Sequence, residues 1–180
     1  LGMELLVTRL DDRLQLLCGG RRTALPRHQT LRATLDWSFG LLPDTEQAVL
    51  RRLAIFAGAF DIDAATGVAS SEDVPPDVVV NCVAELVAKS LIVSDSTAQD
   101  RQYRLLQSTR AYALDKLGTS DEQARIAKQH ANYLLDVFEQ AEAEWGSRPS
   151  PDWLAGYAAR FDDLNGALDW AFGPNGDALL

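Results

Sequence analysis

The sequence predicts a mainly α-helical fold interrupted by one short β-hairpin. Apolar residues recur every three or four positions along most of the 180 residues, which is typical of helices that bury one face. Two short runs rich in β-branched and aromatic residues flank a polar stretch at residues 94–102, which is the pattern of a hairpin. Hydrophobic residues make up 47% of the chain, so it can bury a core.

The composition argues against several classes of function. A net charge of −9 at pH 7 does not suit a surface that neutralises many nucleic-acid phosphates. Cys18, Cys82, His28 and His130 are the only cysteines and histidines, and their spacing is not that of a metal site. We expect the cysteines to be small buried residues in a reducing compartment. No apolar run could span a bilayer and no signal peptide is recognisable, so we expect no membrane contact and a cytoplasmic location.

The first 26 residues predict the end of a helical unit. Leucines at helical spacing run from Leu6 to Leu17 and stop at Gly19, as at a helix end. Leu1 already lies inside this pattern, so we expect the chain to be cut from a longer polypeptide. A linker at Leu25-Pro26 follows. The densest basic cluster surrounds it: Arg21, Arg22, Arg27, His28 and Arg32. This cluster is either a solvated connector or an edge that faces an anion.

Residues 28–42 predict a helix. Leu31, Leu35 and Phe39 recur at helical spacing. Trp37 adds bulk of the kind that a packed core buries, so we expect it inside.

A second helix is predicted to begin after Pro43. Asp44 is a candidate N-cap, and Gln47 lies three residues later as its capping-box partner. Arg51 and Arg52 are expected on the face opposite the apolar one. Gly58 is expected to end this helix.

A winged helix-turn-helix is predicted at residues 27–118. Asp61 can cap a short helix, and Asp77 opens a longer one. Alternating runs at residues 91–93 and 103–106 then predict the two strands of a hairpin. Three helices followed by a hairpin is the order of a winged helix, in which the third helix and the wing are the parts that would meet DNA.

The third helix offers little to DNA. Its polar positions include Asp77 and Glu85 against Lys89 alone, whereas base reading needs Arg, Lys, Asn or Gln flanked by phosphate contacts. We therefore predict that the domain docks on protein and that this segment does not bind DNA. The alternative is a winged helix that binds DNA directly through Asn81, Lys89, Arg101 and Arg104.

The last third of the chain predicts long antiparallel helices. A helix opens at Ser108, and Ser120 with Gln123 forms a candidate capping box for a longer one. His130 lies on or beside the apolar stripe of that helix, where a partly buried, hydrogen-bonded histidine is expected. Pro151 opens the next helix. Residues 119–180 are therefore predicted to start a TPR-like helical array.

Three strings carry a family resemblance: LPRHQTLRATLDWSFGLLPDTEQAVLRRLAIFAGAFDIDAA, LVAKSLIV and YRLLQSTRAYALDKL. They resemble the segment that follows the nucleotide-binding domain in bacterial STAND-class ATPase regulators of the AfsR/SARP and LuxR-related type. The resemblance implies that residues 1–26 end a helical lid, and that a winged helix and a tetratricopeptide-like array follow. It also implies an upstream ATPase domain as partner, with ATP or ADP and magnesium in the parent protein, and self-association through the repeats.

The chain itself contains no P-loop, paired carboxylates or activated nucleophile, so we expect neither catalysis nor a bound cofactor. In related STAND proteins a Met-His-Asp motif contacts the nucleotide through its histidine. The aligned residues here are Leu105-Leu106-Gln107, and Leu106 cannot donate a hydrogen bond to a phosphate. We therefore expect domain docking in place of nucleotide sensing. The candidate docking residues are Arg27, His28, Arg32, Gln107 and Arg110.

Overall fold

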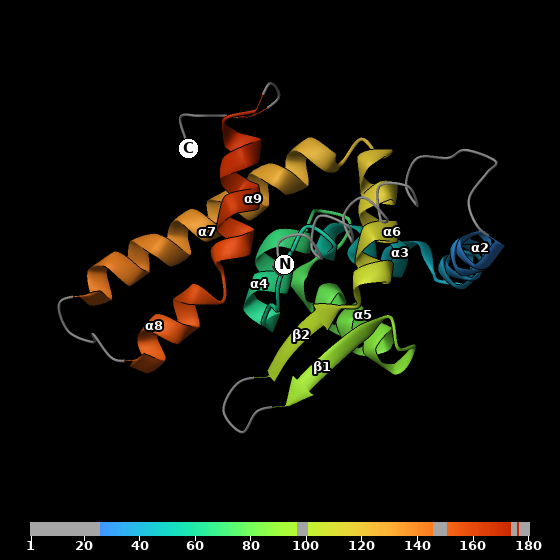
Figure 1. Ribbon diagram of the computed structural model, residues 1–180, viewed down its shortest axis with the longest axis horizontal. Coiled ribbons are helices and arrows are strands. Elements are labelled where there is room, and N and C mark those ends of the chain that lie inside the picture. Colours follow the sequence, from blue (N-terminus) through green and yellow to red (C-terminus); the bar gives the residue numbers. More distant parts are fainter. Residues whose placement is uncertain (1–25, 97–100, 146–150, 174–175, 177–180) are drawn as a thin grey trace, which may run out of the picture.

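The computed structural model describes residues 26–96, 101–145, 151–173 and 176 (Figure 1). The predicted helix before Gly19, residues Arg21 and Arg22, and the side chains of Arg27 and His28 lie outside the described set. The elements are α2 (Pro26–Gly40), α3 (Asp44–Leu53), α4 (Ile62–Ala69), α5 (Pro76–Ala88), β1 (Ile92–Ser96), β2 (Arg101–Leu105), α6 (Gln107–Gly118), α7 (Gln123–Trp145), α8 (Pro151–Ala158) and α9 (Phe161–Ala171). The prediction of a mainly helical chain with one antiparallel hairpin followed by further helices is confirmed.

The main hydrophobic core is enclosed by α3, α4, α5 and the hairpin, and α6 packs against α3. Its centre consists of fully buried aliphatic side chains, among them Leu53, Val68 and Leu86. Burial of side chains of this size stabilises the fold by about 1.5–3 kcal/mol each.

The hairpin pairs β1 with β2 so that Ile92 lies opposite Leu105 (Figure 1). Both strands are longer than predicted, because residues 94–96 and 101–102 are paired and do not belong to the turn. Phe60, in the loop after α3, forms an isolated antiparallel bridge with Tyr103 of β2. The Phe60 N–H donates to the Tyr103 carbonyl at 2.9 Å, and the Tyr103 N–H donates to the Phe60 carbonyl at 2.8 Å. These bonds fasten the hairpin to the core.

A Schellman motif turns the chain from α5 into β1. The Leu91 N–H donates to the Leu86 carbonyl and the Ser90 N–H donates to the Val87 carbonyl, both at 2.9 Å. Ser90 has a φ of 60°, in the left-handed region where glycine is favoured. This turn places the hairpin directly after the third helix of the winged helix.

Several local predictions for residues 28–60 are wrong. Trp37 is 69% exposed, because α2 lies at the edge of the core and presents Phe39 to it instead. Helix α3 begins at Asp44 itself, with no side-chain cap, and Gln47 donates to the Leu42 carbonyl at 2.9 Å. The helix ends at Leu53, well before Gly58.

The two other predicted caps have different outcomes. Asp61 caps α4 as predicted, since its Oδ1 accepts the Ala64 N–H at 2.7 Å. The predicted capping box of Ser120 and Gln123 does not form: the Ser120 hydroxyl accepts the Glu122 N–H at 3.3 Å, and α7 begins at Gln123. Glu122 is thereby placed just before α7, where it enters a buried charge network.

Helices α7, α8 and α9 form an arm beside the winged helix (Figure 1). Helix α7 packs on α4 and on α9, and a small apolar cluster joins Leu134 to Ala167. Helix α8 contacts α7 through the Trp145–Trp153 and Phe138–Tyr157 ring pairs. None of the helices in the described part of the chain is both long enough and apolar enough for a membrane span.

Candidate functional site

The third helix and the wing present few unpaired cations. The Lys89 ammonium donates to both carboxylate oxygens of Glu46 at 2.7 Å and lies 3.5 Å from Glu85. The hydrogen bond to Glu46 is the main reason that the pKa of Lys89 is raised. On the hairpin, Arg104 pairs with Asp95 at 3.3 Å. Among the alternative DNA-contact residues, Lys89 and Arg104 are therefore engaged by carboxylates.

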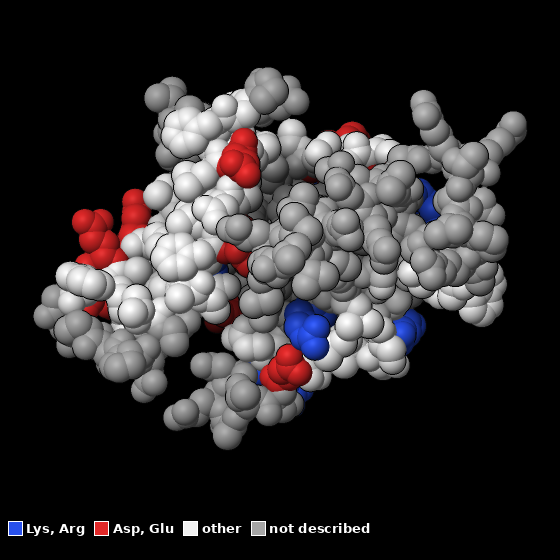
Figure 2. Space-filling model, viewed as in Figure 1, with Lys and Arg blue, Asp and Glu red and all other residues white. Residues whose placement is uncertain are grey.

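The remaining two alternative DNA-contact residues, Asn81 and Arg101, are exposed. They belong to different elements, α5 and β2. On the face drawn in Figure 2, the described basic side chains lie apart from one another, and acidic side chains gather over the arm. The arrangement does not resemble the continuous basic footprint of a typical DNA-binding surface.

Three of the residues predicted to dock on a neighbouring domain have described side chains, and their surroundings differ. Arg32 pairs with Asp115 of α6 at 2.6 Å. The Arg110 guanidinium donates to the Phe56 carbonyl at 2.6 Å and points back into the molecule. Gln107 is exposed at the first residue of α6, so it is available to a partner.

A buried charge network joins the winged helix to the arm, and sequence reasoning missed it. Arg52, predicted on the outer face of α3, is only 4% exposed. It forms a short ion pair with Glu122 and also donates to the Ala69 carbonyl at 2.7 Å. Burial alone raises the pKa of Glu122, but hydrogen bonds and charge from Arg52 and Arg51 outweigh it and lower that pKa below its ordinary value.

A second buried contact fixes α9 to the loop after α3. Asp163, 3% exposed, accepts the Ala57 N–H at 2.5 Å. Nearby, Arg160 pairs with Asp61 at 3.0 Å and donates to the Tyr133 hydroxyl at 2.5 Å. The Ala57–Asp163 hydrogen bond and the Arg160–Asp61 ion pair link the arm to the loop after α3, which also carries Phe60, the residue bonded to the hairpin. These two contacts therefore connect the arm to the winged helix.

His130 lies at the centre of this junction. Its ring packs edge-on against Phe56 with centroids 5.1 Å apart, and its Nε2 is 3.6 Å from Asp163 Oδ1. The predicted burial is confirmed, at 3% exposed. The predicted hydrogen bond is wrong for Nε2, which is fully buried and has no hydrogen-bond partner.

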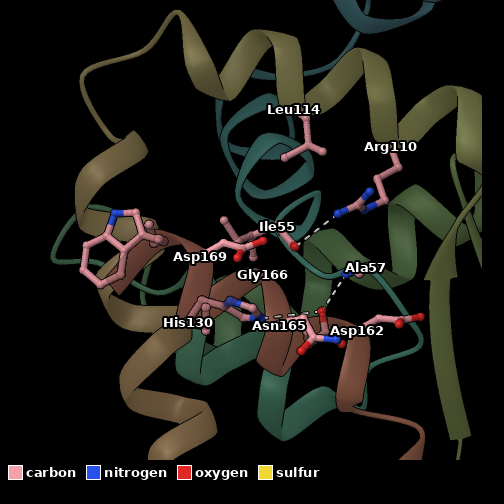
Figure 3. Close-up of a pocket in the computed structure, with 13 residues that line it drawn as sticks. Ile55, Ala57, Arg110, Leu114, His130, Asp162, Asn165, Gly166 and Asp169 are labelled. Carbon is pink, nitrogen blue, oxygen red and sulfur yellow. Dashed lines mark hydrogen bonds and ion pairs between the residues drawn. The ribbon is translucent and has the colours of Figure 1, made fainter. Parts of the chain in front are cut away.

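Beside His130 lies an open pocket of about 640 Å³ between α6 and α9, with α7 as its floor (Figure 3). Arg110 and Leu114 line it from α6, while Asp169 and Trp170 line it from α9. Burial lowers the pKa of Arg110, and the charge of Asp163 acts in the opposite direction.

Comparison with known proteins now identifies the domain. Residues 42–118 match the model of the winged helix-turn-helix domain family, and these residues carry α3 to α6 with the hairpin. Residues 42–118 form a winged helix. Its first helix is α3 and its third helix is α5, and β1 and β2 are the wing. The arm lies outside the matched region.

The chain is also similar to longer mycobacterial proteins. It is 48% identical over 162 residues to a Mycobacterium tuberculosis protein, Rv0890c, with the provisional name of an HTH-type transcriptional regulator. The Mycobacterium bovis protein Mb0914c has the same identity and a name of the same kind. These matches cover 90% of this chain and 18% of either relative. An uncharacterised M. tuberculosis protein, Rv0894, is 41% identical over 69% of the chain and 32% of its own length.

No solved structure matches the chain significantly. The winged-helix match and the names of these relatives are those of regulatory proteins. The described residues include no cluster of three or more His, Cys, Asp or Glu side chains that could hold a metal ion.

Proposed function

We propose that this chain is the regulatory segment of an ATP-dependent transcriptional regulator of the STAND type, in which the winged helix docks on an upstream ATPase domain. The relatives that share 48% identity have names of HTH-type transcriptional regulators, which supports a role in transcription. The family resemblance of the sequence supplies the ATPase partner. ATP or ADP with magnesium would be held by that domain and not by the residues described here.

The observation that carries this proposal is the charge of the third helix and the wing. Lys89 is held by Glu46 and Glu85, and Arg104 is held by Asp95. A helix that reads DNA must direct cations at phosphates, and breaking each of these largely exposed ion pairs would cost up to about 1 kcal/mol of the binding free energy. The face formed by the third helix and the wing carries paired acidic and basic side chains, so a protein surface of mixed charge is a better partner for it than DNA.

Docking through the start of α6 is supported by exposure. Leu106 is 42% exposed, and Gln107 follows it as the exposed first residue of the helix. Helix α6 also carries Arg110, whose guanidinium donates to the Phe56 carbonyl in the loop after α3. A partner bound at the start of α6 would therefore act, through Arg110 and this loop, on the junction with the arm. The arm would then act as the first part of a TPR-like array that self-associates or senses a signal. A switch needs a two-state element of this kind.

The test uses the full-length regulator with Gln107→Glu, and Gln123→Glu as its matched control. Both glutamines are exposed at the first residue of a helix, so the change in charge and helix dipole is the same. We expect Gln107→Glu to weaken ADP binding by about fivefold, a typical coupling, and to raise ATP hydrolysis. Gln123→Glu should leave both unchanged. Equal ADP affinity and equal hydrolysis in the two variants and the wild type would contradict docking at this surface.

Direct DNA binding is the second candidate, and the names of the relatives favour it. It is tested by fluorescence anisotropy with duplex DNA at two salt concentrations, with Lys89, Arg101 and Arg104 replaced together by alanine. Our proposal predicts weak binding that the triple replacement hardly changes. Tight binding that falls steeply with salt and is lost in the triple variant would favour the DNA-binding alternative.

A further inference from the structure

Helix α9 has a second apolar face besides the one that packs on α7. Phe161 is 51% exposed, Leu168 is 44% exposed, and Phe172 at the C-cap is 75% exposed. They are seven and four positions apart, so helical geometry places their side chains on one stripe. The buried residues Asp163 and Ala167 lie on another side of the helix. The stripe of three large apolar side chains is therefore left largely open to solvent.

A series of aromatic contacts extends this apolar surface onto α7 and α8. The Phe161 ring centroid lies 6.4 Å from that of Phe138, and Phe138 lies 6.2 Å from Tyr157. Tyr157 lies 4.8 Å from Trp153, and Trp153 lies 5.3 Å from Trp145. Trp145 ends α7 and is 61% exposed. We call the exposed members of this surface the arm face: Trp145, Phe161, Leu168 and Phe172.

The surroundings of the arm face are acidic. Residues 132–173 contain eight acidic residues and two arginines, and one of these arginines, Arg160, pairs with Asp61 at 3.0 Å. Asp162 and Asp169 are exposed on α9, seven positions apart, along the stripe next to the apolar one. In Figure 2 uncharged side chains cover most of α8 and α9, and acidic side chains lie around them. The arm face is thus an apolar surface with a negative rim.

The apolar stripe and the acidic rim together indicate the chemistry of a partner. Contiguous exposed apolar surface with a polar rim is typical of protein interaction sites, and aromatic side chains are enriched there. A stripe at helical spacing suits the apolar face of another helix, and carboxylates on its flank favour lysine or arginine on that helix. A second copy of the chain would bring a further acidic face against this one, and nucleic acid would bring phosphates.

We propose that the arm face binds a basic amphipathic helix of a partner protein. The apolar side of that helix packs on Phe161, Leu168 and Phe172, and its lysine or arginine side chains pair with Asp162 and Asp169. This interaction is separate from docking of the winged helix on an ATPase domain, because none of these residues belongs to the winged helix.

Two labelled helical peptides with the same leucine stripe serve as probes, one with lysine and the other with glutamate at the polar positions. Fluorescence anisotropy measures their binding to the 180-residue chain and to the full-length regulator. Leu168→Gln/Phe172→Gln removes apolar contacts of the arm face. Leu31→Gln/Trp37→Gln is the matched control, because these two side chains on α2 are 42% and 69% exposed. Replacing exposed side chains should leave the fold intact in both.

A second pair of variants tests the acidic rim. Asp162→Asn/Asp169→Asn removes its charges on α9. Glu72→Gln/Asp73→Asn removes two exposed charges from the loop after α4 and is the control. We expect the rim variant to weaken binding of the lysine peptide by about fivefold, with little change in the control.

The lysine peptide should bind the wild-type chain, the full-length regulator and the α2 variant with equal affinity. Leu168→Gln/Phe172→Gln should weaken its binding by about tenfold, as expected for loss of two apolar anchors. The glutamate peptide should not bind. Absence of lysine-peptide binding, equal binding of the two peptides, or equal losses in the arm and α2 variants would overturn the proposal. Binding to the 180-residue chain alone would show that the regulator covers this face itself. A wild-type dimer in sedimentation that Leu168→Gln/Phe172→Gln dissociates would assign the face to a second copy; either result would also overturn the proposal.

Discussion

Replacing Arg52 should expose how strongly the winged helix depends on the arm. Arg52 is 4% exposed, and its guanidinium pairs with Glu122 and donates to the Ala69 carbonyl at 2.7 Å and the Ser71 hydroxyl at 3.2 Å. Arg52→Met keeps the length of the side chain and removes the charge. Breaking a buried ion pair by removing one partner costs about 3–5 kcal/mol. Glu122 retains Arg51 and Arg125 as partners, so we expect a loss near the lower limit, about 3 kcal/mol.

The measurement is the free energy of unfolding in urea, followed by far-ultraviolet circular dichroism. Glu122→Leu alone should cost a similar amount, because it leaves the Arg52 cation buried. The double variant Arg52→Met/Glu122→Leu should lose less than the two single losses together, by about 1–2 kcal/mol. Arg125→Met is the control: Arg125 pairs with the same glutamate but is exposed, so its loss should stay below about 1 kcal/mol.

The pH dependence of the same unfolding gives an independent check. The pKa of Glu122 is lower in the folded chain than in the unfolded chain, so its stabilisation is present above the unfolded pKa of about 4.5 and is lost as the pH falls through the folded value. Arg52→Met should flatten this acid limb. Additive single losses, or an Arg52→Met loss below about 1 kcal/mol, would refute the view that this pair stabilises the junction.

Further predictions concern the turn, the surface and the tyrosines. Ser90→Gly should raise the free energy of unfolding in urea by about 1 kcal/mol, because glycine relieves the positive φ; a decrease would contradict this. Trp37→Gln should change it by less than about 0.5 kcal/mol, whereas Leu53→Ala in the core should cost about 2–5 kcal/mol; similar losses would place Trp37 in the core after all. Burial and a hydrogen bond to Asp36 raise the pKa of Tyr112, so stability should fall as the pH rises above about 10, and less so in Tyr112→Phe; an unchanged alkaline limb would contradict this.

The parts of the fold that depend on local pattern could be predicted from the sequence. The apolar spacing of α5, the Asp61 cap of α4 and the alternation of the two strands are set by residues close together in the chain, and all three are present. Trp37 shows the limit of this reasoning. A large aromatic side chain on a helix is expected to be buried, but α2 lies at the edge of the core, and no local signal marks that position.

The junction could not be predicted, because its partners lie far apart in sequence. Arg52 and Glu122 are separated by 70 positions, and Ala57 and Asp163 by 106. An arginine pair on a predicted helix is usually solvated, and a single aspartate in an acidic chain carries no signal. The position of His130 on the apolar stripe of its helix predicts its burial, but the groups that face its ring nitrogens depend on where α9 packs.

The position of these charges constrains how the segment can act as a switch. Arg52 and Asp163 are both almost fully buried at the boundary between the winged helix and the arm. Separating the two parts would leave each ion or backbone N–H without its partner until water replaced it, at a cost of several kcal/mol. A signal worth the usual 1–3 kcal/mol could not supply this. The winged helix and the start of the arm should therefore move as one body. Contacts that change when the segment switches should lie on surfaces outside the junction.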